Sequence, residues 1–121
     1  MNYQQITIYH NPRCSKSRQA VEFLNQHNFE VNIIEYLKTI PTKETILGII
    51  NSLDTPIEQI IRQNEEDFKN LKLQIKDLSK SELASIISEN IKILQRPIVV
   101  INDKAIIARP IENLTKLITN D

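Results

Sequence analysis

The first third of the chain holds two short β-branched runs with one helical stretch between them. The runs are residues 6–9 and 31–36, and their Ile, Val and aromatic content is typical of strands. Between them, Ala20 and Leu24 fall on one face at helical spacing. Strand, helix and strand at this spacing predict a βαβ unit with two parallel strands and a right-handed crossover. This unit places the chain in the α/β class.

The middle of the chain predicts an all-helical insertion at about residues 41–93, where apolar residues recur at helical spacing. Capping boxes begin at Thr55 and at Ser79, and each predicts the start of a helix. Gly48, the only glycine, lies inside a helical stripe, where we expect it to allow close packing.

The last quarter returns to strands. Residues 98–101 and 105–107 predict a β-hairpin through the turn Asn102-Asp103, because Asn and Asp tolerate left-handed turn positions. A terminal amphipathic helix is expected after Pro110. The order βαβ, helices, ββα predicts one domain over residues 1–121, a thioredoxin-like four-stranded mixed sheet with the helical insertion.

The single cysteine, Cys14, lies at the turn between the first strand and the first helix. A helix N-terminus presents unpaired N–H groups and a partial positive charge, which stabilise an anion. Arg13, Lys16 and Arg18 add positive charge nearby. We therefore expect a Cys14 pKa below the free value of about 8.5, and hence a nucleophilic thiolate. The alternative is a small buried hydrophobe, as many free cysteines are.

Two neighbours of the cysteine are candidate partners of the sulfur. His10 lies on the strand side of the turn and Ser17 one turn into the helix, so each could donate a hydrogen bond to Cys14. The arginines form a second pattern, because lysine serves as the general surface cation. A planar, permanently charged donor suits oxyanion recognition, although chance and ordinary salt bridges explain the counts equally well. The five arginines are Arg13, Arg18, Arg62, Arg96 and Arg109.

Composition argues against several classes of function. The formal net charge is zero with basic and acidic residues intermixed, so no nucleic-acid or membrane partner is indicated. One cysteine cannot form an intramolecular disulfide, and the N-terminal residues have no features of a signal peptide, so a reducing cytoplasm is expected. No apolar run is long enough to span a bilayer. We expect a monomer with no metal, flavin or bound nucleotide.

Several segments resemble the glutaredoxin-dependent arsenate reductases: residues 10–18, Tyr36-Leu37 with Pro41-Thr42, Ile61-Arg62, Arg96-Pro97-Ile98-Val99-Val100 and Ala108-Arg109-Pro110. The match runs in order over essentially the whole chain. The resemblance implies a thioredoxin-like fold and a catalytic Cys14. It also implies that three arginines bind the arsenate oxygens and that a histidine and a serine help to hold the thiolate. Those positions are Arg62, Arg96 and Arg109, and His10 and Ser17.

The resemblance also implies a mechanism. The Cys14 thiolate attacks arsenate to form a covalent adduct while arginines neutralise the oxyanion. Ser17 stands where a dithiol motif would place a second cysteine, so an outside thiol must complete the reduction. Glutathione then acts as co-substrate, glutaredoxin clears the mixed disulfide, and arsenite leaves. A cis peptide at Arg96–Pro97 is implied as well, although the sequence alone leaves it open.

Two other functions fit much of the same pattern. One is a thiol oxidoreductase of this kind whose substrate is another oxyanion or a glutathione adduct, since site chemistry rather than fold decides the substrate. The other is a redox-sensing transcriptional regulator that binds RNA polymerase. Such regulators usually carry a Cys-x-x-Cys switch, whereas this chain has Cys14-Ser15-Lys16-Ser17.

Overall fold

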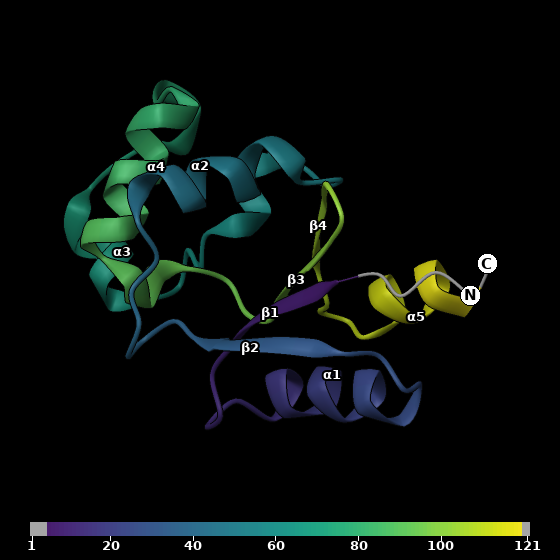
Figure 1. The fold of residues 1–121 in the computed structure, drawn as a ribbon. Helices are drawn as coiled ribbons and strands as arrows, with labels where there is room; N and C mark the ends of the chain where they lie inside the picture. The colour runs from purple at the N-terminus through teal and green to yellow at the C-terminus, as the bar shows by residue number, and fades with distance from the viewer. Residues whose placement is uncertain (1–4, 120–121) are drawn as a thin grey trace.

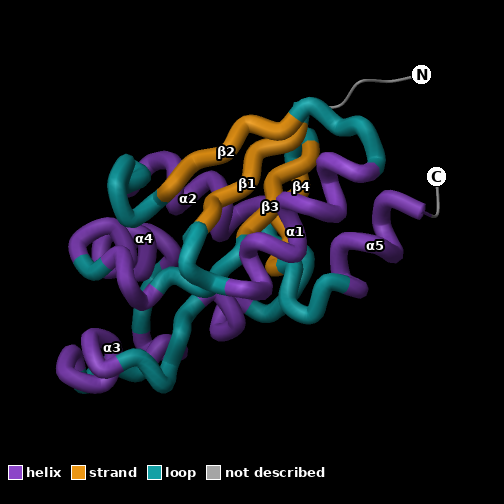
Figure 2. Tube along the Cα trace, turned by 90° about the horizontal axis from the view of Figure 1, so that it is seen from below, coloured by secondary structure: helices purple, strands orange, loops and turns teal. Residues whose placement is uncertain are grey.

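The computed structural model describes residues 5–119 and contains a four-stranded mixed sheet in the order β2-β1-β3-β4. The strands are β1 (Ile6–His10), β2 (Val31–Glu35), β3 (Ile98–Ile101) and β4 (Lys104–Ile107). β1 pairs parallel with β2 and antiparallel with β3, and β3 pairs antiparallel with β4. Figure 2 shows the strands side by side, with helices around them. The predicted α/β class and thioredoxin-like sheet are confirmed.

Helices cover both faces of the sheet (Figure 1). α1 (Ser15–Gln26) and α5 (Glu112–Thr119) lie on one side, and the helices between β2 and β3 lie on the other. These are α2 (Lys43–Ser52), α3 (Glu66–Leu71) and α4 (Lys80–Glu89), with short 3-10 helices at Ile57–Ile60, Ile75–Asp77 and Ile91–Ile93.

The strand β1 supplies both layers of the core because successive side chains point to opposite faces of a sheet. Ile6 and Ile8 are fully buried in one cluster with Leu24 of α1 and Leu114 of α5. Tyr9 faces the other cluster, which contains the buried residues of α2 and α4. The same short strand therefore fixes α1 on one face and the helical segment on the other.

One helix start differs from its prediction. The stretch after Thr55 forms a 3-10 helix, Ile57–Ile60, with Pro56 at its N-cap and no side-chain capping bond. Thr55 Oγ1 is instead buried and has no hydrogen-bond partner among the described residues. The next residue, Ile61, forms an isolated bridge with Leu94. Pairing with a distant segment therefore ends the helix before a full α-helical length is reached.

Other local predictions can be compared directly with the structure. The capping box at Ser79 is present, and Asn102 takes a left-handed φ of 55° in the hairpin turn, so both are confirmed. The prediction for Gly48 is wrong: it lies on the exposed face of α2, and an added Cβ would meet nothing within 4 Å.

The register of the sheet gathers distant segments at one edge. Tyr9 pairs with Ile98, and Ile98 pairs with Ile107, so the end of β1, the start of β3 and the end of β4 are neighbours. Arg96 and Arg109 lie just outside these ends, each before a cis proline. The cysteine turn leaves the same edge.

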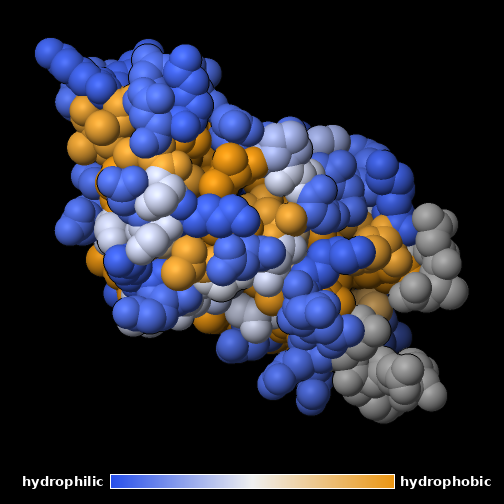
Figure 3. Space-filling model, turned by 90° about the horizontal axis from the view of Figure 1, so that it is seen from above, coloured by the Kyte–Doolittle hydropathy of each residue, from blue (hydrophilic) through white to orange (hydrophobic). Residues whose placement is uncertain are grey.

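The face of the molecule seen from above (Figure 3) is mainly polar. In Figure 3, hydrophilic residues cover most of the visible face, and hydrophobic residues show between them in separate patches. Within residues 5–119, no helix combines the length and hydrophobicity needed to cross a membrane.

Candidate active site

The turn that carries Cys14 is held by backbone hydrogen bonds. The Cys14 N–H donates to Asn11 O at 3.0 Å, which closes the turn around Pro12, and Cys14 O accepts the Arg18 N–H at 3.0 Å. Cys14 is the N-cap residue of α1 and its backbone is extended. The N–H groups of Lys16 and Ser17 hydrogen-bond to its side chain. The sulfur thus sits at the N-terminus of a helix, as predicted.

The electrostatics of this position favour the thiolate. Burial raises the pKa of the Cys14 thiol, whose residue is only 9% exposed. Hydrogen bonds from the Arg96 side chain and from the N–H groups of Ser17 and Lys16, with the charge of Arg96, outweigh burial and lower the pKa to about 7. The thiolate is therefore populated at neutral pH far more than in a free cysteine. The predicted direction of the shift is confirmed, but its charged contributor is Arg96. It is not one of the three neighbours whose charges were expected to act, Arg13, Lys16 and Arg18.

Two arginines, one just before β3 and one just after β4, lie near the sulfur. Arg109 Nη1 lies 3.7 Å from Cys14 Sγ and also donates to the backbone oxygen of Arg96 at 3.4 Å. Arg96 Nε is buried and has no hydrogen-bond partner among the described residues. A buried guanidinium donor without a partner is costly unless an anion accepts from it.

The third arginine reaches the same region from the helical segment. The Arg62 N–H donates to Ile93 O at 2.7 Å, which ties this segment to the one that leads into Arg96. Its Nη1 pairs with Glu65 at 3.0 Å. Arg62 and Arg96 line one groove with Tyr36, and the charges of both arginines and of Cys14 influence the pKa of the Tyr36 hydroxyl.

The side chains of His10 and Ser17 are arranged differently from the expectation. They hydrogen-bond to each other, and Ser17 Oγ also accepts the Asn11 N–H at 3.0 Å. Both residues are buried. Each side chain was expected to be able to donate directly to the sulfur. The contact between Ser17 and Cys14 is made instead by the backbone N–H of Ser17. The two side chains thus brace the turn, and their influence on the thiolate passes through the backbone.

The protonation of His10 suits this bracing. Burial lowers the pKa of the imidazole, Glu35 raises it and Arg18 lowers it, with a net downward shift. The ring is therefore mostly neutral at pH 7. Since Ser17 Oγ already accepts the Asn11 N–H, its hydroxyl proton can be given to Nδ1 of a neutral His10.

Comparison with known proteins identifies the family. The model of the ArsC family matches residues 9–117. This chain belongs to the ArsC family. It is 36% identical over 114 residues to an arsenate reductase of Haemophilus influenzae, covering 93% of this chain and 98% of that protein. A solved structure, an arsenate reductase from Vibrio cholerae, superposes with a TM-score of 0.86 at 34% identity and covers 95% of this chain and 98% of that one.

A relative with a different kind of name is also similar to this ArsC chain. The regulatory protein MgsR of Bacillus subtilis is 32% identical over 114 residues, covering 94% of this chain and 90% of that protein. This chain is therefore similar, over more than nine-tenths of its length, both to a protein named as a reductase and to one named as a regulator.

Tyr36, which was part of the matched pattern but had no expected role in the site, lines the groove of this ArsC-family chain beside Arg62 and Arg96. Tyr36 is 1% exposed and its hydroxyl hydrogen-bonds to the Asn11 side chain. Burial, the largest cause, raises the pKa of Tyr36, so its hydroxyl keeps its proton at neutral pH and can donate to an oxyanion. A usable signal existed: residue 36 follows β2, and β2 is parallel to β1, so both strands end at the edge that carries Cys14.

The site of this ArsC-family chain is suited to hold a small anion against sulfur. Within residues 5–119, no group of three His, Cys, Asp or Glu side chains could hold a metal ion. A groove of about 390 Å³ opens beside it, bordered by Asn11, Tyr36, Arg62 and Arg96 among others. Permanent positive charge, a neutral hydroxyl and a nucleophile thus converge on one place.

Proposed function

We propose that this protein is an arsenate reductase in which Cys14 is the nucleophile and Arg62, Arg96 and Arg109 hold the arsenate oxygens. The observation that carries the proposal is the Cys14 sulfur, with a pKa lowered to about 7, in contact with Arg109 at 3.7 Å. The family membership and the reductases of similar length support the same conclusion.

In the first step, the Cys14 thiolate attacks the arsenic of arsenate. A sulfur–arsenic bond forms, an arsenic–oxygen bond breaks, and the leaving oxygen departs as water after protonation. Arsenic stays in its +5 state. The guanidinium groups neutralise the oxygen charge as it redistributes, and the protonated Tyr36 hydroxyl can donate a hydrogen bond to it. His10 and Ser17 keep the turn in the geometry that exposes the sulfur to the anion.

In the second step, a glutathione thiolate attacks the Cys14 sulfur of the adduct. A disulfide bond forms, the sulfur–arsenic bond breaks, and its electron pair stays on arsenic, which leaves as arsenite in the +3 state. Glutaredoxin then attacks the glutathione sulfur and frees the Cys14 thiolate. An external thiol is required because the chain has a single cysteine. Such a cycle needs a reducing compartment, which fits the cytoplasm.

The test is NADPH oxidation in the presence of arsenate, glutathione, glutaredoxin and glutathione reductase. We expect turnover that depends on arsenate, on glutathione and on glutaredoxin, and none with Cys14→Ser. An NADPH oxidation rate equal to the background without arsenate would overturn the proposal. Arsenate turnover that continues without glutaredoxin would overturn only the last step.

A second candidate is a regulator that binds RNA polymerase, and the similarity to MgsR favours it. The single cysteine at the start of α1 counts against a dithiol switch. Capture of RNA polymerase by the immobilised protein, together with no arsenate turnover, would select this function. Activity on a different oxyanion or on a glutathione adduct, without activity on arsenate, would select the remaining alternative.

A further inference from the structure

The groove beside Cys14 is strongly basic, although the chain as a whole has no net charge. Its walls come from the cysteine turn, the end of β2 with the turn that follows, and the segments around Arg62 and Arg96. The cationic side chains that line it are Arg13, Lys38, Arg62, Lys92 and Arg96.

The two carboxylates that line the groove are already engaged. Glu35 pairs with Lys38 at 3.4 Å, and Glu65 pairs with Arg62 at 3.0 Å. In the part of the chain that the structure describes, no carboxylate forms an ion pair with the other three cations of the groove, Arg13, Lys92 and Arg96. The groove therefore carries an excess of positive charge that an anionic ligand would neutralise.

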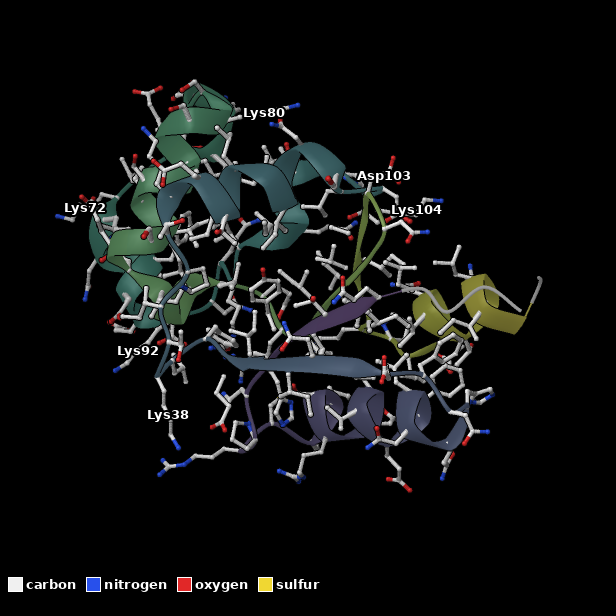
Figure 4. The ribbon with its side chains drawn as sticks, in the orientation of Figure 1. Lys38, Lys72, Lys80, Lys92, Asp103 and Lys104 are labelled. Carbon is white, nitrogen blue, oxygen red and sulfur yellow. The ribbon has the colours of Figure 1, made fainter. Side chains whose placement is uncertain are left out.

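The groove extends from residues that surround Cys14 to exposed lysines. At one end, Arg96 and Tyr36 belong to the surroundings of Cys14. At the other, Lys38 and Lys92 lie on the same side of the molecule (Figure 4), with the half-exposed Leu37 beside them. Its volume of about 390 Å³ is in the range of small-molecule sites.

We infer that this groove is the binding site for glutathione, with Lys38 and Lys92 attracting its carboxylates and Arg96 and Tyr36 marking the end where its thiol meets Cys14. The inference rests on the proposed function. Glutathione has two carboxylates and one ammonium group, so it is a net anion with a thiol in the middle. A basic groove lined by Arg96 and by the residues just before Cys14 holds such a molecule with its sulfur near the adduct, as the second step requires.

The first experiment measures binding without catalysis. S-methylglutathione has the carboxylates but no reactive thiol, so its affinity can be measured by NMR titration in the absence of arsenate. We expect amide shifts around residues 36–38 and 92–96, and a Kd that is about threefold to tenfold higher in the double variant Lys38→Ala/Lys92→Ala. The difference should shrink as salt is added, because exposed charges are screened.

The matched control is Lys80→Ala/Lys104→Ala, which removes the same charge. Figure 4 shows both lysines away from Lys38 and Lys92. The control should bind S-methylglutathione with the Kd of the unaltered protein. An equal rise of Kd in both double variants, or amide shifts elsewhere on the chain, would overturn the inference.

The second experiment measures turnover. In Lys38→Ala/Lys92→Ala we expect the KM for glutathione to rise threefold to tenfold while the KM for arsenate stays unchanged. The rate with 2-mercaptoethanol, which has no carboxylate, should be the same in both proteins. A KM for glutathione that does not change would overturn the inference while arsenate turnover still stood. Binding of S-methylglutathione in the groove without any arsenate turnover would reject the proposed function and leave the groove as a site for anionic peptides.

Discussion

The first turns of α1 and α4 both have backbone N–H groups without partners inside the helix, but these groups have different partners in the two helices. At α4, Ser79 accepts the Glu82 N–H and the Glu82 side chain accepts the Ser79 N–H, so the helix satisfies its own first turn. At α1, the N-cap is Cys14, which has a thiol in place of a hydroxyl or carboxylate cap, and the first turn has no acidic residue. The N–H groups of Lys16 and Ser17 face the sulfur instead.

The difference shows what a helix terminus can be used for. An N-cap of Ser, Thr, Asp or Asn stabilises a helix by about 1 kcal/mol, whereas a neutral thiol caps poorly. The first turn of α1 lacks that stabilisation. Its N–H groups instead lower the pKa of the Cys14 thiol. Stability and reactivity are thus divided between two helices of one small chain.

Replacing Cys14 by Ser should have the largest effect, because it gives α1 the same N-cap residue as α4 and removes the nucleophile. We expect arsenate turnover to fall by at least about 1,000-fold, because the nucleophile is lost. At the same time the free energy of unfolding should rise by up to about 1 kcal/mol at pH 6, since serine is a good N-cap. Urea unfolding monitored by circular dichroism measures the second effect. A large destabilisation would mean that the sulfur is chiefly a packing element.

Replacing Arg96 by Ala should weaken the thiolate without touching either helix start. The Arg96 side chain is the largest stabilising influence on the Cys14 thiolate, so the pKa of Cys14 should rise toward the free value of about 8.5. We expect kcat/KM to fall about 100-fold, the usual loss when one oxyanion donor is removed.

Iodoacetamide labelling against pH measures this pKa. The unaltered protein should show a labelling midpoint near pH 7, and Arg96→Ala a midpoint more than one unit higher. Arg13→Ala is the matched control, because Arg13 is exposed, lies next to Cys14 and has no part in its pKa shift. An unchanged midpoint in Arg96→Ala would contradict the assignment.

The sequence was sufficient to predict the features that depend on local order. The strand and the helical stripe place Cys14 at a helix N-terminus, and the conformations at Ser79 and Asn102 follow from their own side chains. The features that it could not predict depend on tertiary contacts. The stretch after Thr55 is a short 3-10 helix followed by the bridge between Ile61 and Leu94, and Tyr36 comes near Arg62 and Arg96 only in the folded chain.

Replacing Ser17 by Ala separates direct from indirect support of the thiolate. The bracing bond to His10 is lost and the Asn11 N–H loses its acceptor, so the free energy of unfolding should fall by about 1–3 kcal/mol. The backbone N–H that reaches Cys14 remains. We therefore expect a loss of turnover of about tenfold or less, and a Cys14 labelling midpoint near that of the unaltered protein. A midpoint raised as far as in Arg96→Ala would support a direct hydrogen bond from the hydroxyl.

Replacing Ser79 by Ala tests whether the N-cap of α4 contributes to stability and not to turnover. Both bonds of the capping box should be lost, and the free energy of unfolding should fall by about 1 kcal/mol. Turnover and the labelling midpoint of Cys14 should stay unchanged, because α4 contributes no residue to the site. A change in kcat without loss of stability would show that the two helix starts are coupled.

Replacing Gly48 by Ala should have the smallest effect and the opposite sign. Gly48 lies in α2, whose N-cap Thr42 accepts the Thr45 N–H, so this helix resembles α4 rather than α1. A Cβ added at Gly48 meets nothing within 4 Å, so the higher helix propensity of alanine should raise the free energy of unfolding by about 0.5–1 kcal/mol. Urea unfolding checks this value, and arsenate turnover should be unaffected. A less stable variant would contradict this expectation. It would mean that another molecule packs against this face of α2, so that α2 does not contribute to stability through its capping and helix propensity alone.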